Sequence, residues 1–413
     1  MSSFKLSGIN INKTDQNGDT PLFKACHKGD LEIVNSCLIV EGIDLNKTDK
    51  NNISPLNIAV QQGHYDIVKT LVSEAGMKLG IDVNKVNDGG VSPLLIAIFI
   101  GNQKMIELLA NLPQIDLNID DKKGVTPLLL ACQRGLSEIV QLLIKLEVDI
   151  NKKDDNGISP VSIAAQNGHL EIIKMVLAAG GSASDADNEG RTPLYIAAQE
   201  GHLEVVKTIH AAGTNVNQAK NDGCTPLYIA SLRGNVETVR YLLSVGAEVN
   251  TCNAMDACPL LIACYNGHSE VVKLISQTKG VNLNKRMNDD TNSLLLACAL
   301  GHLSIVEALV TAGADINISN LEGCTPLSSA TETKRIEIVK FLIGKGADIN
   351  RTRNNGSSPL LIACKLGELQ IVKLLLATNV ADIHQADKEG ATPMSVAKKN
   401  NHNEIVQALN DSE

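Results

Sequence analysis

Residues Asn188–Val206 read N-E-G-R-T-P-L-Y-I-A-A-Q-E-G-H-L-E-V-V, and each part of this stretch has a mechanical role. Gly190 suits a tight turn that needs a positive φ. Thr192 can cap a helix with its hydroxyl, and Pro193 fits the first helical position, where a missing N–H costs nothing. Gly201 can end that helix before a second, apolar-faced helix begins. The stretch therefore predicts a helix pair too short to bury its own apolar face.

The same frame recurs along the chain. Eleven of the twelve prolines take the position of Pro193, and Ser293 fills the one remaining slot. The motif prolines are Pro21, Pro55, Pro93, Pro127, Pro160, Pro193, Pro226, Pro259, Pro326, Pro359 and Pro393. The steps between slots are 33 or 34 residues, apart from one step of 38. With its T-P-L-x-x-A pattern, this chain resembles the ankyrin-repeat family.

The resemblance implies an all-α fold with short β-hairpins. We expect an α-solenoid of twelve stacked repeats, each a helix-turn-helix plus a hairpin, forming a single domain over residues 1–413. The repeats, numbered one to twelve in chain order, are expected at about 17–46, 51–84, 89–118, 123–152, 156–185, 189–218, 222–251, 255–284, 289–317, 322–351, 355–384 and 389–413. The first and last carry polar residues that suit end caps.

Departures from the repeat pattern give local expectations. Four extra residues around Glu74–Gly80 predict an extension after the second helix of repeat two. Asn52, Asp256 and Asp290 replace the turn glycine, and because Asn and Asp tolerate a left-handed backbone the turn should survive. Repeats eight to ten depart most from the pattern, so we expect them to open more easily than repeats four to seven.

Composition excludes several classes of protein. The formal net charge is −9, whereas a nucleic-acid-binding protein normally shows a basic face. No apolar run reaches membrane-spanning length, and the N-terminus has no apolar signal core. The ten cysteines follow repeat positions rather than a disulfide framework, which favours the reducing cytosol, or alternatively the nucleus. We expect a monomer.

Nine of the ten cysteines fall into three groups, two of which share Cys264. Those in the slot of the second alanine are expected to be small buried side chains: Cys26, Cys132, Cys264, Cys298 and Cys364. Cys224 and Cys324 lie at hairpin tips and are expected to be more exposed. Cys252, Cys258 and Cys264 are spaced by six residues, which favours free thiols, with a disulfide or metal site as the alternative.

Two polar residues recur at fixed positions in many of the repeats. Histidines follow the inter-helix turn and are expected to hydrogen-bond loop backbone of the stacked neighbour: His64, His169, His202, His268, His302 and His402. An asparagine precedes each hairpin and is expected to tie it to the next: Asn46, Asn84, Asn118, Asn151, Asn217, Asn250, Asn284, Asn317 and Asn350. In similar ankyrin proteins this asparagine can be hydroxylated, so a hydroxylase is a possible partner.

No catalytic, cofactor-binding or metal-binding motif is predicted. The histidines recur one helix-packing distance apart, roughly 10 Å, and zinc needs its ligands about 2 Å from one centre. Asp185–Gly190 mimics the start of a calcium loop, but Ile196 stands where that loop needs a bidentate Glu. No protease, hydrolase, dinucleotide or P-loop motif occurs.

The resemblance places partner binding in the concave groove of hairpin tips and first helices. Aromatic and apolar residues in groove-facing slots are the candidates, with Arg191 among the charged tips: Tyr195, Tyr228, Leu232, Met255, Tyr265, Leu300, Phe99, Ile100 and Arg191. Tyrosine is enriched in binding hot spots because it buries a large area with few rotatable bonds. The alternative is that these rings only pack against the next repeat and that the tip charges form a solvated rim.

The sequence therefore predicts a non-catalytic scaffold or adaptor that binds a protein partner. A regulatory subunit or effector that inhibits an enzyme by occluding it is the alternative.

Overall fold

The computed structural model describes residues 10–287 and 290–413. Its regular structure within these ranges is helical, from α1 to α25, with one isolated bridge between Arg286 and Asn292. The chain divides into two compact units. Unit one comprises Met1–Ala197 and Glu204–Thr214, and unit two comprises Ala198–Leu203 and Asn215–Glu413.

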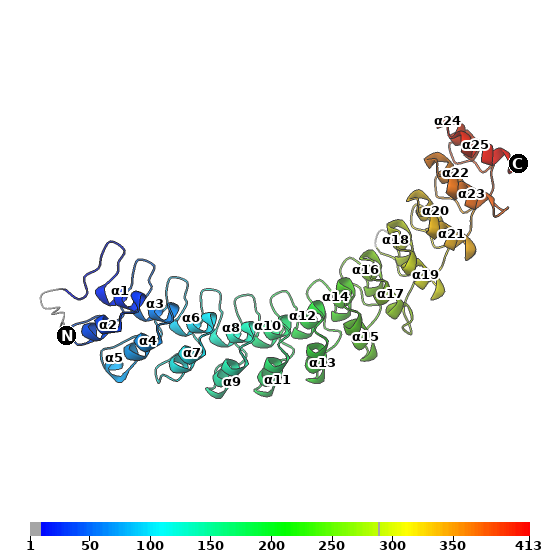
Figure 1. The fold of residues 1–413 in the computed structure, drawn as a ribbon. Coiled ribbons are helices and arrows are strands. Elements are labelled where there is room, and N and C mark those ends of the chain that lie inside the picture. The colour runs from blue at the N-terminus through cyan, green and yellow to red at the C-terminus, as the bar shows by residue number, and fades with distance from the viewer. Residues whose placement is uncertain (1–9, 288–289) are drawn as a thin grey trace. The chain divides into compact units, whose positions relative to one another are not determined.

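Unit one is built from helix pairs whose first and second members form two rows (Figure 1). The first helices are α1 (Pro21–Lys28), α3 (Pro55–Gln61), α6 (Pro93–Ile100), α8 (Pro127–Arg134) and α10 (Pro160–Gln166). The second helices are α2 (Leu31–Leu38), α4 (Tyr65–Leu71), α7 (Gln103–Ala110), α9 (Ser137–Lys145) and α11 (Leu170–Ala178). Helices α12 (Pro193–Glu200) and α13 (Leu203–Ala211) cross the boundary between the units.

Unit two repeats this arrangement. Its first helices are α14 (Pro226–Arg233), α16 (Pro259–Tyr265), α18 (Ser293–Leu300), α20 (Pro326–Glu332), α22 (Pro359–Leu366) and α24 (Pro393–Lys399). Its second helices are α15 (Val236–Ser244), α17 (Ser269–Ser276), α19 (Leu303–Thr311), α21 (Ile336–Gly344), α23 (Leu369–Leu376) and α25 (Asn403–Asn410).

Local chemistry fixes where the first helices begin and end. In α8 the Thr126 hydroxyl accepts a hydrogen bond from the Leu129 amide at 3.2 Å, and Pro127 occupies the first helical position. Gly135 ends the helix with a left-handed backbone, φ 73°. The next repeat then packs against this glycine, because a Cβ there would lie 2.7 Å from Cε1 of His169. Glycine is thus required both by the turn and by the stacking.

The core runs between the two rows of helices in each unit. The leucines that directly follow the motif prolines are almost completely buried, as are the small residues Cys132 and Cys364, five positions after theirs. Small side chains there let neighbouring first helices approach closely.

The expected β-hairpins are absent from the described residues, where the structure has turn loops without strands. The Asp154 loop shows why. Its carboxylate accepts hydrogen bonds from the Asn156 and Ile158 amides at 3.0 and 2.7 Å. Neighbouring loops are joined by single backbone hydrogen bonds, such as Asn188 N to Asn156 O at 3.0 Å. One bond per repeat does not make a ladder.

The repeated asparagines tie successive repeats together, as predicted. Asn46 donates from Nδ2 to the Gly80 carbonyl and accepts from the Asp82 amide, both at 2.7 Å. The same pair of bonds joins Asn84 to the next repeat at 2.8 and 2.8 Å. Among the histidines, the predicted bond between stacked repeats is found for His64, His169 and His268, whose Nε2 atoms lie 3.3, 3.4 and 2.9 Å from carbonyls of the preceding repeat. These carbonyls belong to the last turn of the preceding first helix and not to a loop, as had been expected.

Other local predictions are confirmed. The extra residues of repeat two form a short helix, α5 (Glu74–Lys78), directly after α4. Asn52, Asp256 and Asp290 keep the turn, with φ of 58°, 59° and 63°.

Candidate binding surface

A groove of about 710 Å³ crosses the first-helix face of unit one. It is lined by the C-terminal ends of α3, α6 and α8 and by the loops that precede α6 and α8: Gln61, Asn87, Val91, Leu95, Ile96, Phe99, Ile100, Asp121, Lys123, Val125, Leu130 and Gln133. The groove therefore combines an apolar floor with a polar rim, the composition that binding pockets usually have.

Phe99 and Ile100 are the exposed apolar residues of this groove, at 65% and 43% of their full exposure. They form the last turn of α6, just before the left-handed cap Gly101. The core positions of that helix are filled by Leu94 and Ile98, which are fully buried. Because successive helical residues are turned by about 100°, Phe99 and Ile100 face away from the core.

Arg134 holds Phe99 in place. Its guanidinium carbon lies 5.6 Å from the centre of the phenyl ring, within the range of a cation–π contact. The same guanidinium donates a hydrogen bond to the Phe99 carbonyl. Sequence reasoning missed this arginine because it lies 35 residues from Phe99, one repeat further along the chain.

Tyr195 and Tyr228 do not present their rings to a partner, contrary to our expectation. Only 2% of Tyr195 and 5% of Tyr228 is exposed. The Tyr228 hydroxyl accepts a hydrogen bond from Nδ2 of Asn253 at 3.3 Å, and burial raises its pKa to about 12. These rings are packing residues.

The sequence contained a signal for this burial. Both tyrosines stand two positions after the motif proline, and repeats three, four, eight, nine and eleven carry leucine there. Each of these leucines is buried: Leu95, Leu129, Leu261, Leu295 and Leu361. A slot that leucine fills in five repeats is a core slot.

The other candidates in unit two are more accessible. Met255, at a loop tip, is 65% exposed, and Tyr265, at the end of α16, is 58% exposed. Leu300 is 38% exposed and Leu232 is half-buried. Tyr265 stands six positions after its motif proline, the slot that Phe99 occupies in repeat three. The position six residues after the motif proline is therefore exposed in these repeats, whereas the position two residues after it, which Tyr195 and Tyr228 occupy, is buried.

Arg191, the charged candidate in unit one, is already paired. Its Nε lies 2.7 Å from a carboxylate oxygen of the buried Asp187 and 3.6 Å from one of Glu189. This side chain therefore stabilises its own loop, and a partner would have to compete with Asp187 for it.

The two loop-tip cysteines are more exposed than the fully buried cysteines of the alanine slot, as predicted, but both are still buried. Cys224 is 5% exposed and Cys324 is 9% exposed, because the loop of the next repeat covers each of them. Nδ2 of Asn253 reaches the Cys224 sulfur at 3.8 Å, and Arg353 reaches the Cys324 sulfur at 3.4 Å. All ten cysteines are free thiols. Burial raises the pKa of Cys224 and of Cys252 to about 11, which makes both poor nucleophiles at neutral pH.

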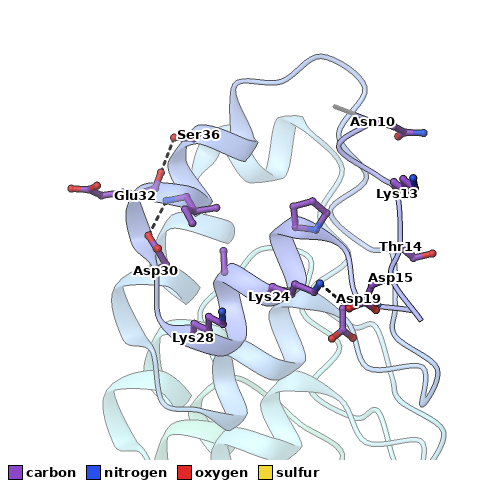
Figure 2. Close-up of a pocket in the computed structure, with 13 residues that line it drawn as sticks. Asn10, Lys13, Thr14, Asp15, Asp19, Lys24, Lys28, Asp30, Glu32 and Ser36 are labelled. Atoms are coloured by element: carbon purple, nitrogen blue, oxygen red, sulfur yellow. Dashed lines mark hydrogen bonds and ion pairs between the residues drawn. The ribbon is translucent and has the colours of Figure 1, made fainter. Parts of the chain in front are cut away.

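A second pocket, of about 830 Å³, lies against α1, α2 and the loop before them (Figure 2). Ile33 and Ala25 contribute apolar surface, while three lysines and four carboxylates also line it. Lys24 forms an ion pair with Asp15 at 2.7 Å, which lowers the pKa of Asp15 to about 2. Because both charge signs are present in similar number, this pocket favours neither an anion nor a cation.

Comparison with known proteins identifies the family. Models of ankyrin repeats in groups of three copies match residues 3–85, 76–154, 131–220, 207–287, 260–353 and 346–413. The chain belongs to the ankyrin-repeat family, whose repeats generally act as protein–protein interaction modules and whose fold is typically non-catalytic.

Among solved structures, the chain is similar to the crystal structure of the human ASB11 ankyrin repeat domain. The sequence identity is 27%, the match covers 54% of this chain and 98% of that domain, and the TM-score is 0.47. A search of curated proteins found no match. None of the helices in the described part of the chain is long and apolar enough to span a membrane.

Proposed function

We propose that this protein is a non-catalytic scaffold or adaptor that binds a protein partner through its loop tips and first helices. The observation that carries the proposal is the groove with Phe99 and Ile100 exposed on its floor. Exposed aromatic side chains in preformed pockets are common binding hot spots. Met255 and Tyr265 offer a second set of exposed apolar side chains, on unit two.

The mechanism is preorganisation. The groove is built on helices whose caps and cores are complete, and Arg134 already fixes the orientation of the Phe99 ring. Binding would therefore order few side chains of this protein, and little affinity would be lost to conformational entropy.

Site-specific photo-crosslinking tests the proposal. A benzophenone amino acid is placed at Phe99, and as a control at Ile39, which is 87% exposed at the end of α2. We expect a discrete protein adduct from position 99 in source cells and none of that size from position 39. The same adducts from both positions, or none from either, would argue against a groove that binds a protein.

Identifying the crosslinked protein also allows an adaptor to be distinguished from an inhibitor. If the captured protein is an enzyme, its activity is measured with and without the purified repeat protein. Loss of activity at stoichiometric protein favours inhibition by occlusion, and unchanged activity favours an adaptor.

A further inference from the structure

The groove around Phe99 is flanked by two identical amide side chains. Gln61, Phe99 and Gln133 stand in the same slot, six positions after the motif proline, in repeats two, three and four. Both glutamines are exposed. Neither side-chain amide hydrogen-bonds to any other described residue, although both line the groove. An amide offers a donor and an acceptor together, which is the pairing that a peptide group requires.

The spacing of these side chains fits an extended chain. First helices of neighbouring repeats pack roughly 8–10 Å apart, and an extended peptide advances about 3.3 Å per residue. A peptide that crosses the groove would therefore pass about three residues per repeat. Gln61 and Gln133 would hold its backbone on either side of the residue that contacts Phe99.

The charges at the groove favour an acidic ligand. Lys123 lines the groove and Arg134 stacks on Phe99, and neither forms an ion pair within the described part of the chain. Lysines of the following loops differ, since Lys152 is paired with Asp120 at 2.9 Å and Lys153 with Asp185 at 3.2 Å.

The groove's one lining carboxylate, Asp121, bonds to its own loop but keeps its negative charge, so the two cations outnumber it by one. Oδ1 of Asp121 accepts hydrogen bonds from the Lys123 and Val125 amides at 2.8 and 3.0 Å. In a protein of net charge −9, the two unpaired cations make the groove locally attractive to a carboxylate, and an arginine can bind one through two parallel bonds.

We propose that this groove binds an extended peptide segment with one bulky apolar side chain and a carboxylate within about three residues of it. The apolar side chain contacts Phe99 and Ile100. The carboxylate pairs with Arg134 or Lys123, and Gln61 and Gln133 hydrogen-bond to the peptide backbone. The inference rests on the proposed function and specifies the ligand of the same groove.

The test uses a phage-displayed library of random dodecapeptides selected on the full-length protein. We expect the selected peptides to share a bulky apolar residue with an acidic residue nearby. In fluorescence polarisation, Phe99→Ala should weaken the best peptide at least about tenfold, the loss expected for a hot-spot residue. The control is Ile39→Ala, an exposed apolar side chain at the end of α2 that does not line the groove, which should leave the affinity unchanged.

A charge swap tests the carboxylate contact. Arg134→Glu and Lys123→Glu are each assayed against the selected peptide and against the same peptide with Lys in place of the acidic residue. We expect one of the variants to lose the acidic peptide and to gain the basic one. Both variants must keep the wild-type melting temperature.

Three results would overturn the inference: no enriched peptide, enriched peptides without an acidic residue, or binding that Phe99→Ala leaves unchanged. The proposed function fails separately, through the photo-crosslink at position 99. An adduct with a folded domain, together with an empty peptide selection, would show that the groove binds protein surfaces rather than extended segments.

Discussion

Gly135 and Gly63 have the same left-handed backbone but different surroundings. Their φ angles are 73° and 76°, yet a Cβ on Gly135 would lie 2.7 Å from His169 Cε1, whereas one on Gly63 meets nothing within 4 Å. Gly63→Ala should therefore cost about 1 kcal/mol, from the left-handed backbone alone. Gly135→Ala should cost about 1 kcal/mol more, because it also disturbs the bond from His169 to the Gln133 carbonyl. Urea unfolding of both variants measures the difference, and equal losses would contradict the role of glycine in stacking.

Truncation should destabilise the protein far more at Tyr228 than at Tyr265. Tyr228→Ser removes a buried ring and leaves Asn253 without its hydroxyl partner, so we expect a loss of about 3 kcal/mol. Tyr265→Ser removes an exposed ring and should change stability by less than about 0.5 kcal/mol. Denaturant unfolding followed by circular dichroism distinguishes them. A small effect of Tyr228→Ser would restore this tyrosine as a candidate for partner binding.

The Asp15–Lys24 ion pair gives the first repeat a pH dependence. The hydrogen bond from Lys24 is the largest cause that lowers the Asp15 pKa, from an ordinary 3.8 to about 2. A carboxyl with a depressed pKa in the folded state stabilises above its unfolded pKa, and this contribution disappears as the pH falls from about 4 to about 2. In Lys24→Met the Asp15 pKa should return toward 3.8. NMR titration of the side-chain carboxyl carbon measures it, and an unchanged pKa would contradict the assignment to Lys24.

Among the structural elements, the asparagine tie is the most regular link between repeats. Asn46 makes both of its bonds across repeat two even though α5 is inserted before Gly80, so the insertion leaves the stacking intact. Asn46→Ala should cost about 2 kcal/mol, since two inter-repeat bonds are lost. Asn46→Asp should cost less, because it keeps the acceptor for the Asp82 amide. Hydrogen exchange of the Asp82 amide should be fastest in the alanine variant, and identical exchange in both would contradict this order.

The elements could be predicted where the governing chemistry is local. A threonine or serine followed by proline sets a helix start within three residues, and an Asp or Asn in a glycine slot keeps its turn. The sequence also predicted the extension of repeat two and the asparagine ties, because each repeats or interrupts a fixed period. In each of these features, the interacting residues stand at fixed offsets that the repeat length gives.

The burial of a side chain by a neighbouring repeat could not be predicted from the sequence pattern. Cys324 is covered by Arg353, 29 residues away, and Cys224 by Asn253, also 29 residues away. Phe99 and Ile100 were recognised from their slots, but Arg134 was not, because its contact with Phe99 arises only when repeat four packs against repeat three. The binding role of Phe99, Ile100 and Arg134 stays a prediction.

At the scale of the whole molecule, repeats eight to ten carry more structural defects than repeats four to seven in the described part of the chain. Cys258 makes no side-chain cap bond at the start of α16, whereas Thr126, Ser159 and Thr225 cap α8, α10 and α14. Asn292 caps α18, but its Nδ2 is buried without a partner in the described residues. Lys334 holds a left-handed backbone, φ 59°, in place of glycine. Each of these defects costs roughly 1 kcal/mol in other proteins.

Repeats eight to ten should therefore open before repeats four to seven. We expect hydrogen exchange, followed by mass spectrometry, to be faster in α16, α18 and α20 than in α8, α10 and α14, because local opening follows local stability. Cys258→Thr should restore the missing cap by accepting from the Leu261 amide and should slow exchange in α16 by about tenfold, the equivalent of one cap bond. Thr225→Cys is the reciprocal variant and should speed exchange in α14 by a similar factor. Uniform exchange along the chain, with neither variant changing it, would mean that the repeats unfold as one cooperative block whose stability the caps do not limit.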